Sequence, residues 1–300
     1  MSRPASYQEA TARERLQQLF DPDSFEEFLP PSERVISPHL GQLNAPVAFD
    51  DGVAVGRAAL GGVTVYAAAQ EGGFMGGAVG EVHGAKLVGL LRRAVRDQAK
   101  AVVLLVESGG VRLHEANAGL IAVSEVMRAL LDARAAGIPV IVLVGGSNGA
   151  FGGMGIVSRC ANVVVMSEEG RLAMSGPEVI ETASGVEEFD SRDRALVWRT
   201  SGGKHRYLMG DCQRIVADDI AAFRAAARDA VAALTGKQVE LTLEALEAEQ
   251  RMLDERIARF GALHDPVDIW SAMQIADAAN IPMLDVDSFI AAAAKHRMGA

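Results

Sequence analysis

The chain has 300 residues, of which 49% are hydrophobic and 23% are charged, a composition typical of a folded globular protein. Its formal net charge of −10 and the lack of a long lysine or arginine run argue against a nucleic-acid-binding surface. The polar N-terminus lacks the apolar core of a signal peptide, and no apolar run has the length of a membrane span. We therefore expect a cytoplasmic protein with neither nucleic acid nor membrane as a partner.

Cysteine and histidine are sparse in this sequence. The two cysteines, Cys160 and Cys212, are too few for a disulfide framework or a four-cysteine zinc ribbon. His83 is isolated and His114 lies next to Glu115, so neither has the spacing of a metal-ligand pair. We therefore expect free thiols and no metal site.

The first third of the chain predicts a helix, a β-hairpin and a second helix. Thr11–Leu29 is expected to form a short helix that ends in a turn. Two runs of β-branched and small residues, Val53–Leu60 and Val63–Gln70, flank a Gly-Gly pair, which indicates a hairpin. Apolar residues from Val82 to Val95 recur at helical spacing.

Strands and helices then alternate, which predicts parallel strands joined by right-handed crossovers. The expected elements are a strand at 101–106, a helix at about 115–136, a strand at 140–144, a helix at about 151–160, and strands at 162–166 and 171–174. A further helix is expected to start near Pro177. After about residue 201 the expected helices cover Ile215–Leu234, Thr242–Ile257 and Val267–His296. The predicted fold class is α/β with a helical C-terminal extension.

Two glycine-rich turns carry the strongest functional signal. Glu107–Ala116 and Gly145–Gly155 each follow a short apolar strand and open a predicted helix. Backbone N–H groups at such a turn lie at the positive end of the helix, so two turns together can stabilise one developing oxyanion. The alternative is that the glycines only allow tight packing against the sheet. Gly152, Gly153 and Gly155 favour the oxyanion interpretation, because each weakens a helix unless something must lie close to it.

A third glycine-rich segment precedes the helix that begins near Val79. This segment, Gly72–Ala78, contains Gly76 and Gly77. It either borders the same cleft or lets the hairpin pack tightly, and the sequence leaves both alternatives open.

No catalytic dyad is evident from residue spacing. Ser108 and Ser147 are candidate nucleophiles beside His83 or His114, but neither serine lies in a G-x-S-x-G elbow. Asn148 is a candidate for orienting a ligand and is equally typical of a turn. Donors without an acid–base pair suit a reaction limited by a developing enolate, so thioester enolate chemistry is the favoured class.

Four segments resemble the carboxyltransferase branch of the crotonase-like superfamily. They are GGFMGGAVGEVHGAK (Gly72–Lys86), ESGGVRLHEA (Glu107–Ala116), AAGIPVIVLVGGSNGAFGGMG (Ala135–Gly155) and RLAMSGPEVIE (Arg171–Glu181). Their order and spacing are similar to those of acetyl-CoA carboxylase carboxyltransferase β subunits, and closer to the β subunits of biotin-independent malonate decarboxylases. The resemblance covers about residues 30–235 and implies a crotonase-like spiral of repeated ββα units. It divides the chain into an N-terminal helical segment (1–30), a carboxyltransferase-like domain (31–235) and a helical extension (236–300).

Two departures distinguish the sequence from biotin-dependent relatives. Bacterial acetyl-CoA carboxylase β subunits usually carry an N-terminal four-cysteine zinc ribbon, whereas this chain has no cysteine before Cys160. Val111–Ala116 also differs from the alanine–arginine–methionine/isoleucine–glutamine pattern usual in those relatives. Both departures favour the decarboxylase family, so no biotin is expected.

Membership of that family implies a substrate, partners and a shared active site. The substrate would be the malonyl thioester of an acyl-carrier protein subunit, whose arm is phosphoribosyl-dephospho-CoA, and the products would be the acetyl thioester and CO2. The resemblance also implies a γ subunit of homologous fold, with the active site between the two folds, and an acyl-carrier transferase subunit. No cofactor is expected to be bound by this chain itself.

The resulting hypothesis assigns a role to each candidate residue. The N–H groups of Gly110 and Ala150 would bind the thioester oxygen, and Gly109 and Gly149 would shape the turns. Candidate proton donors or orienting groups are His114, Ser147 and Asn148, and expected substrate-binding residues are Ser108, Gly76, Gly77, Gly152 and Gly153. The open alternatives are a carboxyltransferase β subunit of a biotin-dependent carboxylase, a hydratase or thioesterase that acts alone, and a non-catalytic structural half of a complex.

Overall fold

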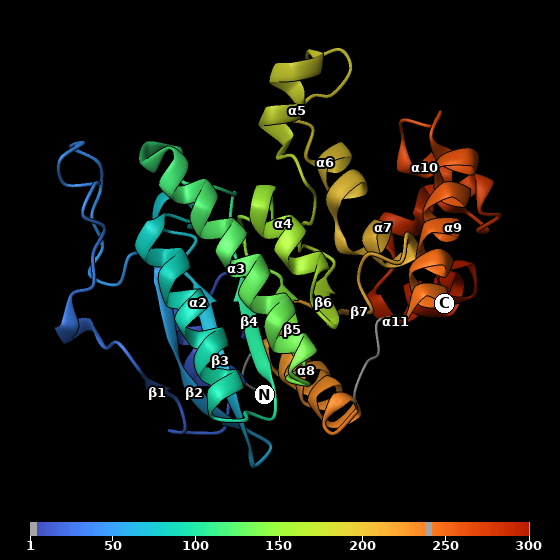
Figure 1. Ribbon diagram of the computed structural model, residues 1–300. Helices are drawn as coiled ribbons and strands as arrows, with labels where there is room; N and C mark the ends of the chain where they lie inside the picture. Colours follow the sequence, from blue (N-terminus) through green and yellow to red (C-terminus); the bar gives the residue numbers. More distant parts are fainter. Residues whose placement is uncertain (1–4, 238–241, 300) are drawn as a thin grey trace.

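One mixed sheet of seven strands organises the fold, and its strands lie side by side in sequence order (Figure 1). This computed structural model describes residues 5–237 and 242–299. The first three strands pair antiparallel and the remaining pairs are parallel. The strands are β1 (Glu26–Glu27), β2 (Val53–Leu60), β3 (Val63–Gln70), β4 (Val102–Val106), β5 (Val140–Val144), β6 (Val163–Ser167) and β7 (Arg214–Val216).

The predicted hairpin is confirmed as β2 and β3. Leu60 pairs with Val63, and the two residues between them, Gly61 and Gly62, have φ angles of 60° and 79°. Positive φ at both central residues is the requirement of a tight hairpin turn that matches the twist of the strands, and glycine meets it without strain.

Helices cover both faces of the sheet, because alternate residues of each strand point to opposite sides. Every residue of β4 and β5 is buried, as expected for central parallel strands. Helices α2, α3 and α4 pack with one set of strand residues, whereas α1 and α8 pack with the other (Figure 1). Their bounds are α1 Ala12–Leu19, α2 Glu81–Arg96, α3 Asn117–Ala135, α4 Gly152–Arg159 and α8 Ile220–Leu234.

Beyond the ends of the parallel strands, the chain forms a second layer of single β-bridges. Ser108 bridges Ala150, and Ala150 also bridges Leu172. The predicted strand at 171–174 is therefore wrong, since this segment forms only isolated bridges. Each bridged segment follows a parallel strand and precedes a helix. The predicted α/β crotonase-like fold class is confirmed.

The remaining helices lie beside and beyond the last strands. They are α5 (Pro177–Ser184), α6 (Arg194–Ser201), α7 (Gly203–Leu208), α9 (Leu243–Phe260), α10 (Pro266–Ala272) and α11 (Val286–Ala293), with short 3-10 turns η1 (Pro31–Glu33), η2 (Met75–Gly77), η3 (Leu113–Glu115), η4 (Ala278–Met283) and η5 (Ala294–His296). Figure 1 shows α9, α10 and α11 as a separate group next to α7. This group has its own apolar core, which includes Phe260, Trp270 and Phe289.

Three predicted helices differ from those expected. The stretch Val267–His296 is not one helix, since it is divided among α10, η4, α11 and η5. The N-terminal helix stops at Leu19, because Phe20 is extended and the chain continues into β1. Ile215 belongs to β7, and α8 begins only after Asp219, whose side chain accepts a hydrogen bond from the Ala221 N–H. Within the described ranges, we find no helix long and apolar enough to cross a membrane.

Candidate active site

The two glycine-rich turns lie against each other at the carboxyl ends of β4 and β5. The Ser108 N–H donates to the Gly149 carbonyl at 2.7 Å, and the Phe151 N–H donates to the Ser108 carbonyl at 2.8 Å. A Cβ on Gly152 would lie only 3.0 Å from the Cα of Gly110. The structure therefore brings together the two segments that the sequence singled out.

The predicted pair of oxyanion donors needs correction. The Ala150 N–H already donates to the Arg171 carbonyl at 2.8 Å, so its assignment as a free donor is wrong. The Gly110 N–H is also occupied, since it donates to the Ser108 hydroxyl at 3.2 Å. The two shaping glycines use their N–H groups within the turns, where Gly109 donates to the Gly76 carbonyl and Gly149 to the Gly146 carbonyl.

The unpaired donors lie one residue after Gly110 and three and four residues after Ala150. No acceptor within residues 5–237 and 242–299 pairs with the N–H of Val111 or with the N–H groups of Gly153 and Met154. The N–H of Val111 points away from Val79, its partner in a β-bridge, because the two hydrogen bonds of that bridge use the Gly110 carbonyl and the Arg112 N–H. Gly153 and Met154 are in the first turn of α4, where backbone N–H groups have no partner within the helix.

These donors lie where the two turns approach each other. A Cβ built on Gly152, the residue before Gly153, would lie 3.9 Å from the Val111 nitrogen. The N-terminus of α4 adds a partial positive charge to the same place. The predicted start of this helix near residue 151 is the sequence signal that could have pointed to Gly153.

The third glycine-rich segment is part of the same assembly. The Gly76 carbonyl accepts the Gly109 N–H at 2.8 Å. A Cβ on Gly77 would lie 1.8 Å from the Glu107 carbonyl oxygen, so only glycine allows this approach. The structure thus places this segment against the first turn, and whether it borders the cleft stays a prediction.

The candidate side chains differ in their access to the site. His114 and Ser147 are exposed, and the Ser147 hydroxyl has a weak contact of 3.4 Å with the Gln8 carbonyl. The amide of Asn148 is half-buried and donates to the Glu107 carboxylate at 3.1 Å. Ser108 is fully buried and bonds within its own turn, so its hydroxyl supports the turn.

A buried charged network behind the first turn was not predicted. The Arg112 guanidinium is 2.9 Å from both carboxylate oxygens of Asp51, and it lies 3.6 Å from Glu115. Burial raises the pKa of Asp51, and the charge of Arg112 opposes that rise. Arg112 directly follows Val111, whose N–H is unpaired. The network therefore fixes the backbone next to this donor.

His83 closes a buried connection between Asp51 and the start of the first turn. Its Nδ1 lies 3.1 Å from the Asp51 carbonyl and its Nε2 lies 3.0 Å from the Gln70 amide nitrogen. A carbonyl can only accept, so Nδ1 carries the proton and Nε2 accepts from Gln70. The Gln70 amide oxygen in turn accepts the Glu107 N–H at 3.2 Å, so the ring is neutral and cannot reach Ser108 or Ser147 as a base.

Two buried histidines should make the protein sensitive to acid. Burial lowers the pKa of both His83 and His205 to about 3, far below the value of about 6.5 in an unfolded chain. The unfolded state therefore binds more protons between these values, so stability falls as the pH drops below about 6.5. The expected slope is about 1.4 kcal/mol per pH unit for each histidine.

Urea unfolding at pH 7, 6 and 5 measures this slope. The variant His83→Gln, which keeps a hydrogen-bonding side chain, should have a slope smaller by about one proton. Equal slopes for the variant and the wild-type protein would show that His83 does not contribute.

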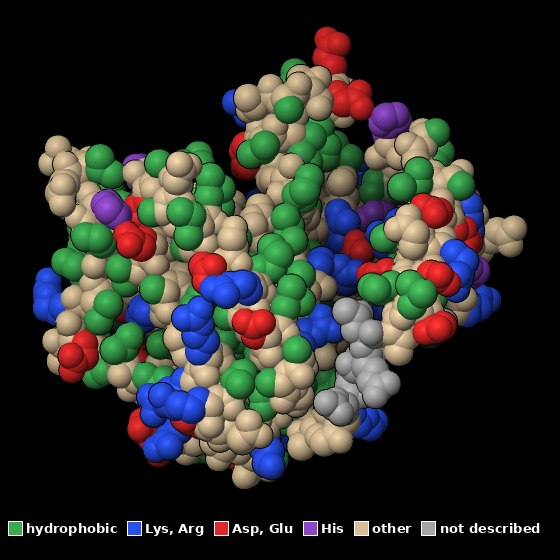
Figure 2. All heavy atoms as spheres, viewed as in Figure 1, with side chains coloured by type: hydrophobic (Ala, Val, Ile, Leu, Met, Phe, Trp, Pro, Cys, Tyr) green, Lys and Arg blue, Asp and Glu red, His purple; other side chains and the backbone are tan. Residues whose placement is uncertain are grey.

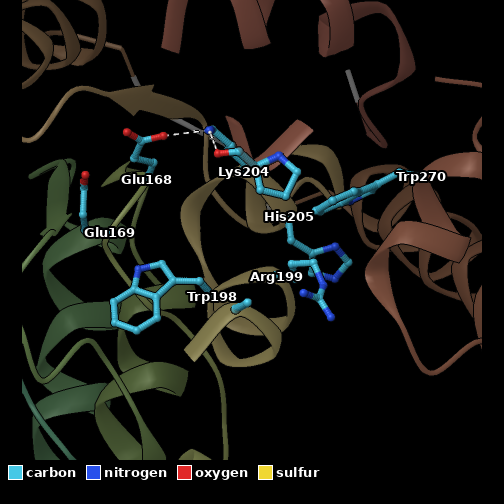
Figure 3. A pocket seen from close by; sticks show the side chains of 9 residues that line it. Glu168, Glu169, Trp198, Arg199, Lys204, His205 and Trp270 are labelled. Carbon is cyan, nitrogen blue, oxygen red and sulfur yellow. Dashed lines mark hydrogen bonds and ion pairs between the residues drawn. The ribbon is translucent and has the colours of Figure 1, made fainter. Parts of the chain in front are cut away.

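One pocket beside the C-terminal helices is separate from the turns. A cavity of about 340 Å³ lies between α6, α7 and the C-terminal group, and Trp198 and Trp270 line opposite sides of it (Figure 3). The Lys204 ammonium is 2.7 Å from Glu168 and also donates to the carbonyls of Pro282 and Leu284. Lys204 therefore attaches the C-terminal segment to the core.

The seven-stranded mixed sheet and the layer of β-bridges beyond its parallel strands define an α/β fold of the crotonase-like class. Within that class, the chain belongs to the carboxyl transferase domain family, which matches residues 6–259.

Relatives of known function cover most of the chain. A malonyl-S-ACP:biotin-protein carboxyltransferase from Malonomonas rubra is 45% identical over 233 residues, which are 73% of this chain and 73% of that protein. One chain of a Pseudomonas malonate decarboxylase hetero-tetramer, solved with malonate, is similar with a TM-score of 0.79 and 35% identity, covering 90% of this chain and 97% of its own. The acetyl-CoA carboxylase carboxyl transferase subunit β of Fusobacterium nucleatum is 29% identical over 192 residues, covering 58% of this chain and 59% of that subunit. The resemblance to the carboxyltransferase branch is confirmed.

Proposed function

We propose that this chain is the β subunit of a malonate decarboxylase, which with a γ subunit converts malonyl-S-acyl-carrier protein into acetyl-S-acyl-carrier protein and CO2. The observation that carries the proposal is the pair of unpaired N–H groups on Val111 and Gly153 where the two turns meet. The similarity to a malonate decarboxylase subunit over nearly the whole chain supports the choice of substrate.

The chemistry needs an oxyanion site more than it needs a base. The bond between the carboxylate carbon and the methylene carbon of the malonyl group breaks, and its electron pair forms the thioester enolate. The Val111 and Gly153 N–H groups donate to the enolate oxygen, and CO2 leaves. A proton then adds to the methylene carbon and gives the acetyl thioester. Removal of one such donor typically costs about 2.7–4 kcal/mol of transition-state stabilisation.

The candidate proton donors are the groups that solvent or the partner subunit can reach. His114 and Ser147 are exposed on the open side of the turns and remain candidates, together with water or a group from the γ subunit. The Asn148 amide is already bonded to Glu107, which makes it an orienting group. The carrier's phosphoribosyl-dephospho-CoA arm presents the substrate, and the proposal includes no biotin.

An apolar surface beside the turns supports a partner subunit. Large apolar side chains are exposed on η3, α3, the segment before α5, and α5 itself: Leu113 (83%), Met174 (70%), Ile121 (62%), Val179 (61%) and Leu120 (54%). Figure 2 shows hydrophobic side chains gathered over α4 and α5. Exposed apolar groups of this density are typical of a protein–protein interface. We propose that the γ subunit covers this surface and closes the site.

The test is co-expression with the γ, acyl-carrier protein and acyl-carrier transferase subunits, followed by a CO2-release assay. The purified complex should release CO2 from malonyl-carrier, and malonyl-CoA tests whether the free coenzyme can replace the carrier. The isolated β chain should be much less active, because half of the site is missing. A complex that binds the carrier but releases no CO2 would contradict the proposal.

A second candidate function is transfer of the malonyl carboxyl group to a biotin protein. The 45% identical relative from Malonomonas rubra is a malonyl-S-ACP:biotin-protein carboxyltransferase, and the first half-reaction of such a transfer requires the same enolate. Streptavidin blotting of the native complex and inhibition of turnover by avidin distinguish the two functions. Activity without biotin and without avidin sensitivity supports the decarboxylase.

A further inference from the structure

Glu107 belongs to the first turn, and its side chain contacts both the second turn and the N-terminal helix. It follows the last residue of β4, and only 6% of its side chain is exposed. Its Oε1 accepts both the backbone N–H of Asn148 at 3.2 Å and the side-chain amide of Asn148 at 3.1 Å. Its Oε2 forms an ion pair with the Arg15 guanidinium. One carboxylate therefore ties together three segments that are distant in sequence.

Arg15 supplies the positive charge that neutralises this carboxylate. Its side chain is 1% exposed, and the donors not used by Glu107 go to the carbonyls of Tyr7 at 2.8 Å and Gln8 at 3.2 Å. Its guanidinium also lies 4.6 Å from the centre of the Tyr7 ring. A buried carboxylate needs such a partner, because an uncompensated charge in the interior is strongly unfavourable.

Glycines enclose the carboxylate on two further sides. A Cβ on Gly72 would lie 2.2 Å from Glu107 Oε1, and a Cβ on Gly146 would lie 2.3 Å from Oε2. A side chain at either position would displace the carboxylate, so the two glycines leave the room that it occupies. Glu107 thus has no freedom to move relative to either turn.

From this geometry we propose that Glu107, neutralised by Arg15, is a positioning residue that sets the separation of the Val111 and Gly153 donors. It is covalently part of the first turn and fixes the start of the second turn through Asn148. Both of its oxygens are engaged and buried, so it acts on the reaction through the turns and does not touch the substrate. The inference rests on the proposed function, because it assigns the N–H groups as donors to the enolate.

The test compares variants of the assembled complex. Glu107→Gln places an amide N–H₂ against either Arg15 or Asn148, both of which are donors, so one contact must be lost. We expect kcat on the malonyl thioester to fall about a hundredfold, the loss that a misplacement of about 1 Å can cause, with KM within about twofold. The double variant Arg15→Gln, Glu107→Gln restores a matched pair and should recover most of kcat.

A steric variant and two matched controls separate positioning from stability. Gly72→Ala keeps both charges and pushes the carboxylate, so it should also lower kcat, whereas Gly89→Ala meets nothing within 4 Å and should not. Asp211→Asn removes an equally buried, ion-paired carboxylate next to α7. It should lower the melting temperature and leave kcat unchanged.

Hydrogen exchange followed by mass spectrometry provides a readout that does not need turnover. Glu107→Gln should speed exchange in residues 107–111 and 146–153, and Asp211→Asn should not. If the wild-type complex releases no CO2, the proposed function fails while the exchange experiment still tests the role of Glu107. Wild-type kcat and exchange in Glu107→Gln, or an equal effect in Asp211→Asn, would overturn the inference.

Discussion

Gly110→Val is expected to lower the kcat of the assembled complex at least a hundredfold. Gly110 has a φ of 124°, which a β-branched residue does not adopt without strain. The peptide that follows it carries the Val111 N–H, so a change at residue 110 turns that donor away from the site. A Cβ would also lie 3.5 Å from the Cα of Gly152, and the methyl groups of valine would press on the start of α4. Loss of one oxyanion donor typically lowers kcat by about 10²–10³.

The neighbouring glycine provides the matched control. Gly109 does not have a positive φ, and a Cβ there would be 3.4 Å from the Gly76 carbonyl oxygen, an ordinary contact. Gly109→Ala should therefore keep most of the activity. Thermal unfolding and gel filtration with the γ subunit establish that the Gly110 variant still folds and binds its partner. Full activity of Gly110→Val would refute the oxyanion assignment.

Arg112→Met is expected to lower the free energy of unfolding by about 3–5 kcal/mol, which is the usual effect of breaking a fully buried ion pair. The guanidinium is completely buried and faces the carboxylates of Asp51 and Glu115. Without Arg112 these two carboxylates lose their shared counter-charge in an environment that already raises the pKa of Asp51. Methionine fills a similar volume, so lost packing adds little. Urea unfolding at pH 7 measures the difference.

An exposed pair calibrates that result. Arg57 and Glu26 are 2.7 Å apart with about half of each side chain exposed, so Arg57→Met should change stability by less than about 1 kcal/mol. The double variant Asp51→Asn, Arg112→Met removes both members of the buried pair and should recover part of the loss. If Arg112→Met and Arg57→Met are equally mild, the buried network does not stabilise the first turn.

The relatives do not decide between decarboxylation and carboxyl transfer to biotin, because that choice depends on the partner subunits. Decarboxylation and carboxyl transfer to biotin share the C–C bond cleavage and the enolate, so the proposed donors on Val111 and Gly153 would serve either reaction. What differs is the fate of CO2, which depends on whether a biotin group can reach the site. The departure at Val111–Ala116 favours free CO2, whereas the 45% identical relative favours biotin. Sensitivity of turnover to avidin therefore distinguishes the two reactions.

Much of the fold follows from local patterns in the sequence. The β2–β3 hairpin has the predicted bounds, because the Gly-Gly pair allows only a tight turn between two strand-forming runs. The central strands and α2 were also predicted, since apolar runs and helical spacing reflect burial directly. The short strand β7 was missed because three residues carry no recognisable period, and its pairing with β6 comes from distant contacts.

The sequence by itself determined the α/β class, the two glycine turns and the carboxyltransferase family, because these depend on residue type and spacing along the chain. The tertiary structure decided which N–H groups are free. Ala150 loses its donor to the Arg171 carbonyl and Gly110 loses its donor to the Ser108 hydroxyl, while Val111 and Gly153 keep theirs. Likewise, only the folded chain places Arg15 against Glu107. A hydrogen bond joins groups that are close in space, and for these groups the separation in sequence does not reveal that proximity.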